Sequence, residues 1–436
     1  MTIDSEEGVD VEIREEPPHS RPAPIVLDRE RHCISRNLIP DNTLKVLYRL
    51  HRSGFKAYLC GGSVRDLLMS RAPKDFDIAT DAHPMQVRRL FRNSRIIGRR
   101  FRLVHVVFQE GVVEVATFRR EPGVRDDGEL LVTDDNTFGT PEQDARRRDF
   151  TINGLFYNIA DFSIIDYAGG LADLESRLIR VIGDPDIRFR EDPVRMMRAI
   201  EFASRLDFEI EAATWDAIIR HRDEILKASP ARVSEEILEL LRRGWSLDAF
   251  ELMVETRLLE ALIPGLYASL VSGEADYFWR MLEVLDRTIQ SGRQFSDGVF
   301  WAVLMLPGFF KALEQEEASR GERLRPGDAF GLVRDVVAPV AARLVFPSGV
   351  RHHVEQSLEA LWRVQEPPTD RKSQWRLVFR EHFGDALALF ELYALSSGRC
   401  VETFREWQSF ARRVQRQEEP MPAPRAPRRR SRRRRS

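Results

Sequence analysis

Two aspartates one residue apart, Asp75 and Asp77, are the residues of this chain most suited to chemistry. In an extended strand, residues two apart point to the same side, so both carboxylates would face one site while Phe76 faces the core. Hard divalent cations bind carboxylate and phosphate oxygens together, and two of them can activate an attacking oxygen and stabilise a leaving pyrophosphate. Many surface turns also contain Asp-x-Asp, so the prediction of a two-Mg²⁺ site depends on the surrounding residues.

The stretch before these aspartates has the features of a phosphate-binding turn. An apolar run over residues 57–60 predicts a short buried strand, and Gly61 and Gly62 let backbone amides approach a ligand closely. Ser63 is placed to cap the helix that follows, and Arg65 lies on its first turn. Because the positive end of a helix favours anions, this stretch predicts contacts to the phosphates of a nucleotide.

A third carboxylate, Glu114, lies in the middle of a β-branched run. Residues 102–109 and 111–118 predict two strands joined as a hairpin, and Glu114 falls among the valines of the second strand. An acidic side chain in that position is costly unless it is paired or bound to a metal ion. Glu114 is therefore a candidate third metal ligand or a support for the site.

Arg148 and Asp149 form the next candidate pair. Residues 144–158 contain three successive arginines, then Asp149 and several apolar residues, which predicts a helix. Arg148 is suited to a triphosphate because a guanidinium group binds phosphate oxygens in pairs. Asp149 would orient this arginine or face the metal ions. The alternative for both residues is an ion-paired helix face.

A later helix has donors and acceptors suited to a nucleobase. Residues 192–206 predict a helix with Asp192 as its N-cap and Pro193 in its first turn. Asp192, Arg195 and Arg198 recur every third residue and share one face. An accepting aspartate and a donating arginine can read the edge of adenine or cytosine, whereas guanine and uracil present the reverse pattern. A solvated charged face is the alternative.

The composition indicates a multi-domain protein of a reducing compartment. A length of 436 residues predicts about two to four domains, and 43% hydrophobic residues is ordinary for a globular protein. The three cysteines are too few and too far apart for a disulfide framework or a zinc ribbon, and the histidines show no metal-ligand spacing. The N-terminus is acidic rather than signal-like, and the longest apolar run, Val299 to Leu306, is too short to span a bilayer. We expect a cytoplasmic protein.

The C-terminal residues form a separate electrostatic region. Residues 425–436 contain eight arginines and no acidic residue, so the rest of the chain carries a formal charge of −10, which is −2 less those eight charges. A block of like charge with Pro and Ser does not fold on itself and commonly binds nucleic acid. Arg428, Arg429 and Arg430 are therefore expected to contact RNA, with a solubilising tail as the alternative.

The pattern along the chain predicts five regions. Residues 1–22 are acidic and aperiodic, which is typical of disorder, and residues 23–160 would form a head that contains the paired aspartates. Residues 161–235 would form a neck that recognises the base, and residues 236–416 a helical body and tail that bind RNA. Residues 417–436 would be a disordered arginine-rich end.

Four ordered motifs resemble a known family. They are GGSVRDLLMSRAPKDFDIAT from Gly61, RRDFTIN from Arg147, DYAGGLADL from Asp166 and EDPVRMMRA from Glu191. Together they resemble the class II nucleotidyltransferases of the polymerase-β superfamily, which include bacterial poly(A) polymerases and CCA-adding tRNA nucleotidyltransferases. The resemblance covers roughly residues 24–416. It implies an α+β fold in which a polymerase-β-like head of mixed sheet and helices is followed by an all-helical neck, body and tail.

The resemblance also implies roles for individual residues. Asp75 and Asp77 would hold two Mg²⁺ ions, with Asp149 as a further catalytic carboxylate. The residues expected to bind the incoming nucleotide are Gly61, Gly62, Ser63, Arg65, Arg148, Asn153, Asp192, Arg195 and Arg198. At Glu201 the family usually has a third arginine, so a phosphate contact is not expected at this position.

Three features resemble the polyadenylating branch more than the CCA-adding branch. The segment IGRRFRLVHV from Ile97 is bulky and rich in arginine, whereas CCA-adding enzymes tend to have a smaller, glycine-bearing segment. Within it, Arg99, Arg100 and Arg102 are expected to bind RNA. The HCISR arm from His32 and the terminal arginines are also similar to the polyadenylating branch.

The resemblance thus implies a template-independent polymerase that adds AMP from ATP to RNA 3′ ends and releases pyrophosphate. Its partners would be ATP and mRNA, tRNA or small RNA, without a membrane, and the chain would act as a monomer in RNA polyadenylation and turnover. Two alternatives stay open. One is CCA addition to tRNA, and the other is a non-catalytic RNA-binding protein on the same fold.

Overall fold

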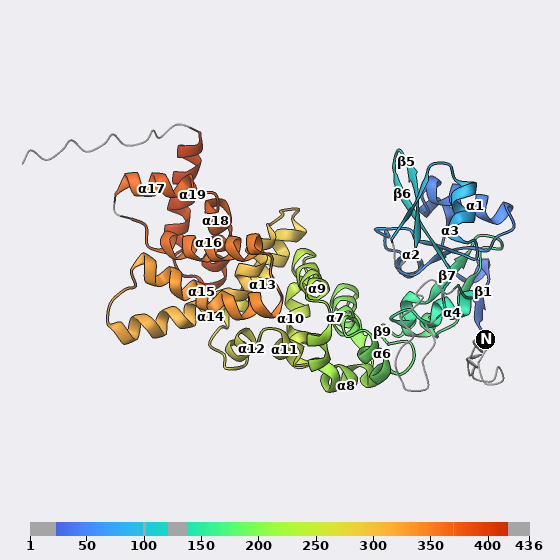
Figure 1. The fold of residues 1–436 in the computed structure, drawn as a ribbon, viewed down its shortest axis with the longest axis horizontal. Helices are drawn as coiled ribbons and strands as arrows, with labels where there is room; N and C mark the ends of the chain where they lie inside the picture. The colour runs from blue at the N-terminus through green and yellow to red at the C-terminus, as the bar shows by residue number, and fades with distance from the viewer. Residues whose placement is uncertain (1–22, 99–101, 121–137, 369, 417–436) are drawn as a thin grey trace, which may run out of the picture. The chain divides into compact units, whose positions relative to one another are not determined.

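The structure, a computed structural model, describes residues 23–98, 102–120, 138–368 and 370–416. The chain divides into two compact units, Met1–Arg188 with Phe208–Thr214, and Phe189–Asp207 with Trp215–Ser436. The first unit contains the β-sheet, and the second is built of helices (Figure 1). A mixed sheet followed by helices confirms the α+β class. The finer division at residues 160 and 235 stays a prediction.

A mixed sheet of eight strands forms the centre of the first unit. Its strand order is β1-β8-β7-β2-β3-β6-β5-β4, in which β3 and β6 are parallel and the other neighbours are antiparallel. The strands are β1 (Ile25–Leu27), β2 (Ala57–Cys60), β3 (Ile78–Thr80), β4 (Ser94–Ile97), β5 (Leu103–Phe108), β6 (Gly111–Thr117), β7 (Leu155–Asn158) and β8 (Ile164–Asp166). The paired aspartates therefore lead directly into a central strand.

Helices cover both faces of this sheet. α1 (Asp41–Arg52) and α3 (Pro84–Leu90) pack with the strands in the larger of two apolar cores. On the opposite face, α4 (Pro141–Arg146) contributes Ala145 to a smaller core. α2 (Gly62–Leu68) starts where β2 ends, so the glycine turn lies at the carboxyl end of an inner strand of the sheet.

The remaining elements of the first unit are short. A parallel pair joins β9 to β10, which returns from later in the chain. These elements are β9 (Leu178–Ile179), β10 (Glu209–Ile210), α5 (Gly170–Glu175), α6 (Pro185–Glu191), which continues into the second unit, and the 3-10 helices η1 (Arg29–Arg31), η2 (Arg36–Leu38) and η3 (Thr151–Asn153).

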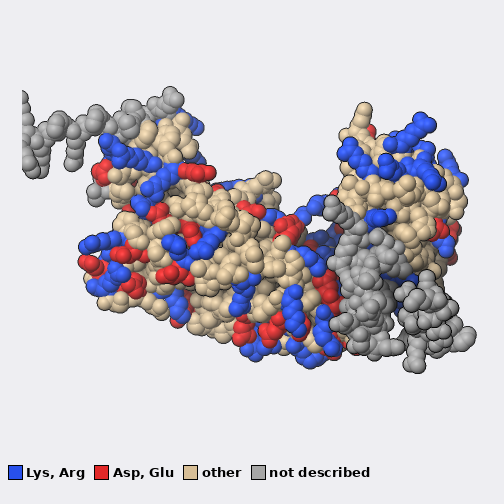
Figure 2. All heavy atoms as spheres, viewed as in Figure 1, with Lys and Arg blue, Asp and Glu red and all other residues tan. Residues whose placement is uncertain are grey.

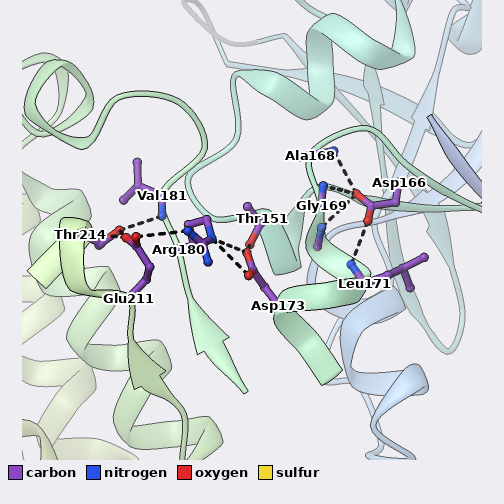
Figure 3. Close-up of polar contacts among 11 residues, drawn as sticks. Thr151, Asp166, Ala168, Gly169, Leu171, Asp173, Arg180, Val181, Glu211 and Thr214 are labelled. Carbon is purple, nitrogen blue, oxygen red and sulfur yellow. Dashed lines mark hydrogen bonds and ion pairs between the residues drawn. The ribbon is translucent and has the colours of Figure 1, made fainter. Parts of the chain in front are cut away.

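Asp166 fixes the turn that begins α5 (Figure 3). Its buried carboxylate accepts hydrogen bonds from four consecutive backbone amides, those of residues 168–171, at 2.8 to 3.0 Å. A Cβ on Gly170 would lie 2.2 Å from the carbonyl oxygen of Thr151, so only glycine fits this approach. Hydrogen bonds and a close backbone approach therefore hold this turn in place.

Asp173 and Arg180 tie the returning strand to the same region (Figure 3). Asp173 Oδ2 accepts hydrogen bonds from Thr151 Oγ1 at 2.6 Å and from Arg180 Nε at 3.0 Å. Arg180 Nη1 lies 3.2 Å from Glu211 Oε1, and Glu211 Oε2 accepts bonds from the amide and hydroxyl of Thr214. This network joins β10 to β9 through side chains as well as backbone.

The second unit is helical throughout its described residues. Its elements are α7 (Val194–Leu206), α8 (Ala212–His221), η4 (Arg222–Lys227), α9 (Pro230–Arg242), α10 (Ser246–Glu255), α11 (Leu258–Leu262), α12 (Pro264–Val271), α13 (Tyr277–Gln290), α14 (Asp297–Arg320), α15 (Pro326–Arg343), α16 (Ser348–Gln365), α17 (Arg371–Val378), α18 (Phe383–Ser397) and α19 (Val401–Gln415). α14, α16 and α18 pack against one another around Trp301, Phe309 and Phe390. None of the helices in the described part of the chain is long and apolar enough to cross a membrane.

Three local predictions can now be judged. The hairpin of residues 102–109 and 111–118 is confirmed as β5 and β6, with Phe108 opposite Gly111. The helix predicted over residues 144–158 is wrong, because this segment forms α4, a 3-10 turn and strand β7. The strand predicted at Asp75 to Asp77 is also wrong, since β3 starts one residue later.

Candidate active site

Asp75, Asp77 and Glu114 lie in one pocket, next to the start of β3 and the first half of β6. The two strands are parallel with Ile78 opposite Val115, which brings the preceding residues Asp77 and Glu114 next to each other. The pocket has a volume of about 800 Å³. It is lined by Pro40, Asp41, Asn42, Thr43, Lys45, Lys74, Asp75, Phe76, Asp77, Glu110, Gly111, Val112, Val113 and Glu114.

Among the acidic residues of this pocket, Asp75 and Glu114 act on the charge of Asp77. The side chain of Asp75 is 72% exposed, and that of Glu114 is 47% exposed and lies 3.1 Å from His105 Nε2. Burial raises the pKa of Asp77, and the charges of Glu114 and Asp75 raise it further against the opposing charge of Arg148. Carboxylates that disfavour each other's charge are stabilised by a divalent cation, so these residues fit Mg²⁺.

Gly61 forms the turn between β2 and α2. Its φ of 71° favours glycine, and a Cβ there would lie 2.9 Å from Arg148 Nη1. A Cβ on Gly62 would lie 3.3 Å from Arg65 Nη2. The amide of Gly61 donates to the carbonyl of Leu155 at 3.1 Å, so this amide is already used within the protein. The glycine pair thus makes room for two arginines.

Ser63 does not cap α2, and that prediction is wrong. The N-cap of α2 is Gly61, and no side chain caps it. Ser63 is buried, and its hydroxyl donates to the carbonyl of Cys60 at 3.1 Å. A role for Ser63 in nucleotide binding stays a prediction.

Arg65 connects the glycine turn to the segment around Asp149. Only 2% of Arg65 is exposed, and its Nη1 donates to Asn153 Oδ1 at 2.6 Å. Asn153 Nδ2 in turn donates to Asp149 Oδ1 at 3.0 Å. The structure therefore brings Arg65, Asn153 and Asp149 into one hydrogen-bonded chain, although their spacing in the sequence does not suggest it.

Arg148 is anchored by Asp144, a residue that the sequence reasoning missed. Arg148 Nη2 lies 3.0 Å from Asp144 Oδ2, and its guanidinium carbon lies 5.2 Å from the ring centre of Phe156. Burial lowers the pKa of Arg148, but the neighbouring Cys60 and Asp144 produce a net rise, so the guanidinium stays charged. An acidic residue four positions before an arginine is a usual helical ion pair, which was the available signal.

Asp192 is held by Arg232 of α9, which the sequence did not suggest. Arg232 Nη1 and Nη2 donate to the two carboxylate oxygens of Asp192 at 3.0 and 2.9 Å. The N-cap of α7 is Pro193, so the prediction that Asp192 caps this helix is wrong. Arg195 pairs with Glu191, whose Oε2 lies 3.2 Å from Arg195 Nη1.

The next turns of α7 carry Arg198 and Glu201. The guanidinium of Arg198 lies 5.1 Å from the ring centre of Phe202, and Glu201 pairs with Arg205 at 3.2 Å. Glu236 of α9 faces this side. Burial raises the pKa of Glu236 to about 7, with Arg198 lowering it and Glu201 raising it. Glu201 therefore adds a negative charge to a surface of α7 that also contains Arg198 and Arg205.

Most of the predicted RNA contacts fall outside the described residues. Arg102 is described and exposed, and it directly precedes β5. The predicted contacts that lie outside the described residues are Arg99, Arg100, Arg428, Arg429 and Arg430.

Comparison with known proteins identifies the family. Residues 57–180 match the poly A polymerase head domain, and residues 207–270 match the probable RNA and SrmB-binding site of polymerase A. Poly(A) polymerase I of Escherichia coli O6:H1 is 38% identical over 392 residues, which cover 86% of this chain and 83% of that protein. The chain belongs to the poly(A) polymerase family. The family resemblance drawn from the four motifs is thereby confirmed.

CCA-adding enzymes are also similar to this chain, one of them over about half of the chain in sequence and another over most of the chain in structure. The CCA-adding enzyme of Lactobacillus johnsonii is 40% identical over 223 residues, which cover 51% of this chain and 55% of that protein. The solved CCA-adding enzyme of Bacillus stearothermophilus in complex with CTP has a TM-score of 0.60 and 27% identity, covering 86% of this chain and 81% of that one. The polymerase-β-like fold and the nucleotidyltransferase class are confirmed.

Proposed function

We propose that the chain is a template-independent poly(A) polymerase, which transfers AMP from ATP to the 3′-hydroxyl of RNA and releases pyrophosphate. The observation that carries this proposal is the pocket that gathers Asp75, Asp77 and Glu114 within the region matching the poly A polymerase head domain. The likeness to poly(A) polymerase I extends over most of both chains, whereas the likeness to the Lactobacillus CCA-adding enzyme covers about half.

In this proposal, Asp75 and Asp77 hold two Mg²⁺ ions and Glu114 supports the same cations. Held by these carboxylates, Mg²⁺ would supply the positive charge that favours loss of the hydroxyl proton and that stabilises the charge on the triphosphate. The chain's own contribution is positioning. Arg148 presents a fixed positive charge at the glycine turn, and Asp149 is the further carboxylate, oriented by Asn153.

The same proposal assigns the choice of base to α7. Asp192 accepts from the exocyclic amino group of adenine and Arg195 donates to its ring nitrogen. Arg232 grips both oxygens of Asp192, which fixes the plane of this carboxylate. The pair rejects guanine and uracil, so ATP is favoured over GTP and UTP. Cytosine offers a similar edge, so the pair alone does not exclude CTP.

Surface charge supports binding of the RNA backbone. Lys and Arg side chains gather over the unit that contains α1 and α3 (Figure 2). The exposed cations of α1, α3, β4 and the turn between α3 and β4 include Lys45, Arg49, Arg52, Arg88, Arg89, Arg92 and Arg95. Such a surface attracts the phosphates of any RNA and makes affinity depend on salt. Residues 99–102, the matched region 207–270 and the terminal arginines are further proposed contacts.

We place the enzyme in the cytoplasm as a monomer, where ATP and the 3′ ends of mRNA, tRNA and small RNA are available. The proposed division is a catalytic head over residues 23–160, a base-recognition neck over residues 161–235 and an RNA-binding body and tail over residues 236–416. Sedimentation of the purified chain tests the monomer, because a dimer would have twice the mass of 50.5 kDa.

Nucleotide choice on two RNAs tests the proposed function. The purified chain receives Mg²⁺ with ATP, CTP or both, and either a tRNA lacking CCA or an unrelated RNA of similar length. We expect long A tracts on both RNAs. Addition that stops at CCA on the tRNA alone would instead establish a CCA-adding enzyme. The absence of any addition, with RNA still bound, would establish a non-catalytic RNA-binding protein.

The terminal arginines are tested by removing residues 425–436. RNA affinity of the shortened chain is expected to fall and to depend less steeply on salt. The reason is that a chain with fewer phosphate contacts releases fewer counterions when it binds RNA. Filter binding at several salt concentrations measures both effects. An unchanged dependence of RNA affinity on salt would show that these residues affect solubility and do not bind RNA.

A further inference from the structure

A cluster of His353, His382 and Asp385 lies in the helical unit. One ligand atom from each residue lies within 4.8 Å of the ligand atoms of the other two. His353 belongs to α16, His382 is the N-cap of α18, and Asp385 lies in the first turn of α18. The spacing of these residues in the sequence does not indicate a cluster, because the whole of α17 separates α16 from α18.

The three side chains are oriented toward one another. His353 Nε2 is in direct contact with Asp385 Oδ2, and the imidazole rings of His353 and His382 have centres 4.6 Å apart at an interplanar angle of 36°. Ser296 Oγ donates to Asp385 Oδ2 at 2.9 Å. A Cβ on Gly298 would lie 2.7 Å from the His353 ring, so the backbone of α14 closely abuts this imidazole.

We propose that His353, His382 and Asp385 form a binding site for one Zn²⁺ ion that joins α16 to α18. Two imidazole nitrogens and one carboxylate oxygen are a usual zinc ligand set, with water in the fourth position. Mg²⁺ and Ca²⁺ prefer all-oxygen ligands and do not suit it. This site is separate from the carboxylate pocket and does not depend on the proposed function.

The spacing of the ligands is compatible with zinc after a small movement. With bonds of about 2.0 to 2.2 Å in a tetrahedron, two ligand atoms of one zinc ion lie roughly 3.3 to 3.6 Å apart. Because the ligand atoms of the cluster lie within 4.8 Å of one another, side-chain shifts of at most about an ångström bring the more distant ones to this spacing. The Ser296 hydroxyl supplies the outer hydrogen bond that orients a ligating carboxylate.

A third histidine lies beside the cluster. His352 is exposed on α16, and its ring centre lies 6.0 Å from that of His382, but it does not belong to the ligand cluster. It therefore provides a matched control.

Zinc titration of the full-length, tag-free chain tests the site. The protein is stripped with a chelator and titrated by calorimetry with excess Mg²⁺, which fills carboxylate sites without competing for imidazoles. We expect each chain to bind one Zn²⁺ ion even in excess Mg²⁺. The melting temperature of the chain should rise when Zn²⁺ is added. His382→Ala should weaken binding about 100-fold or more, Asp385→Asn about 10-fold or more, and His352→Ala should bind like the wild type.

Two results would overturn the proposal. One is a wild-type chain that takes up no Zn²⁺ in the presence of Mg²⁺, which would leave the cluster as a His–Asp hydrogen bond. The other is equal binding by the wild type, His382→Ala and Asp385→Asn. Circular dichroism of each stripped variant separates lost ligation from lost folding, and Asp385→Asn, which keeps the size of the side chain, serves if His382→Ala does not fold.

Discussion

The first unit contains two sets of aspartates that look alike in the sequence, since each belongs to a motif with a Gly-Gly pair. Asp75 and Asp77 stand at a pocket with few protein contacts, and among the described residues the contact recorded for the Asp75 carboxylate is Lys74 at 4.0 Å. Asp166 and Asp173 are 2% and 6% exposed and accept hydrogen bonds from backbone amides and side chains.

The difference shows how the same side chain serves chemistry in one place and folding in another. A carboxylate surrounded by protein donors is satisfied and has no lone pairs to offer a cation. Burial raises the pKa of Asp77, and the neighbouring Glu114 and Asp75 raise it further against Arg148, so a cation would stabilise its charged form. The two sets differ in the number of hydrogen-bond donors around each aspartate. This number cannot be predicted from the sequence.

Replacing an aspartate of the pocket should have the largest effect. Asp77→Ala and Asp75→Ala are each expected to lower the rate of AMP addition more than about 1,000-fold, since a cation ligand is lost, which corresponds to over about 4 kcal/mol of barrier. Labelled ATP and a model RNA measure the rate. RNA binding and the urea midpoint should match the wild type. A variant that retains a tenth of the activity would remove that residue from the site.

Replacing Asp166 should act on stability and leave the chemistry alone. Asp166→Ala removes the acceptor for four backbone amides, so the free energy of unfolding is expected to fall by about 3 to 5 kcal/mol. Urea unfolding followed by circular dichroism measures this change, and Asp75→Ala is the matched exposed control. Equal midpoints for the two variants would contradict the comparison.

Glu236 tests whether a raised pKa alone marks a site. Its pKa of about 7 exceeds the ordinary 4.5, so the folded chain keeps a proton that the unfolded chain loses between these values. The stability from this group is present below about pH 4.5 and is lost as pH rises through 7. Glu236→Gln should therefore be about 1 to 3 kcal/mol more stable than wild type at pH 8, and less so at pH 5. Urea unfolding at both pH values measures it, and a difference independent of pH would contradict it.

Glu114 is intermediate between the two sets, since it lines the pocket and also pairs with His105. Glu114→Gln is expected to lower the rate of AMP addition about 10-fold, or about 1.4 kcal/mol, because it removes one supporting charge and leaves Asp75 and Asp77 in place. The labelled-ATP assay measures it, with His105→Gln as the matched control for the ion pair. A loss as large as that of Asp77→Ala would make Glu114 an essential ligand.

Local patterns predicted several elements well. The strand over residues 57–60 follows from an apolar run that ends at Gly61, and the β5–β6 hairpin follows from two β-branched runs that meet at Gly111, which are short-range signals. Residues 144–158 misled the prediction because Leu155, Phe156 and Tyr157 are buried in succession. Such a run is typical of a strand covered on both faces, but periodicity alone does not distinguish it from a buried helix.

Contacts between distant residues could not be predicted from the sequence. The pairing of Asp192 with Arg232 and that of Arg65 with Asn153 each join residues far apart in the chain. Asp75 and Asp77 line one pocket, although the strand from which the Asp-x-Asp spacing argument started is absent there, and the addition of Glu114 depends on the parallel pairing of β3 and β6. Residue types indicated which side chains could bind a base or a phosphate. The protein residues that hold those side chains in place depend on the fold.

The strand order of the sheet has a consequence for synthesis on the ribosome. β2 lies between β3 and β7, and β1 pairs with β8, so that Ile25 stands opposite Asp166. The amino-terminal strands therefore emerge long before their partners, and the nascent sheet keeps an open, apolar edge until β8 has been made. Non-local pairing of this kind slows folding and exposes the chain to aggregation. A truncated chain that ends before β7 would lack one of the two partners of β2, and one that ends before β8 would lack the partner of β1, so we expect an isolated catalytic fragment to need at least β8.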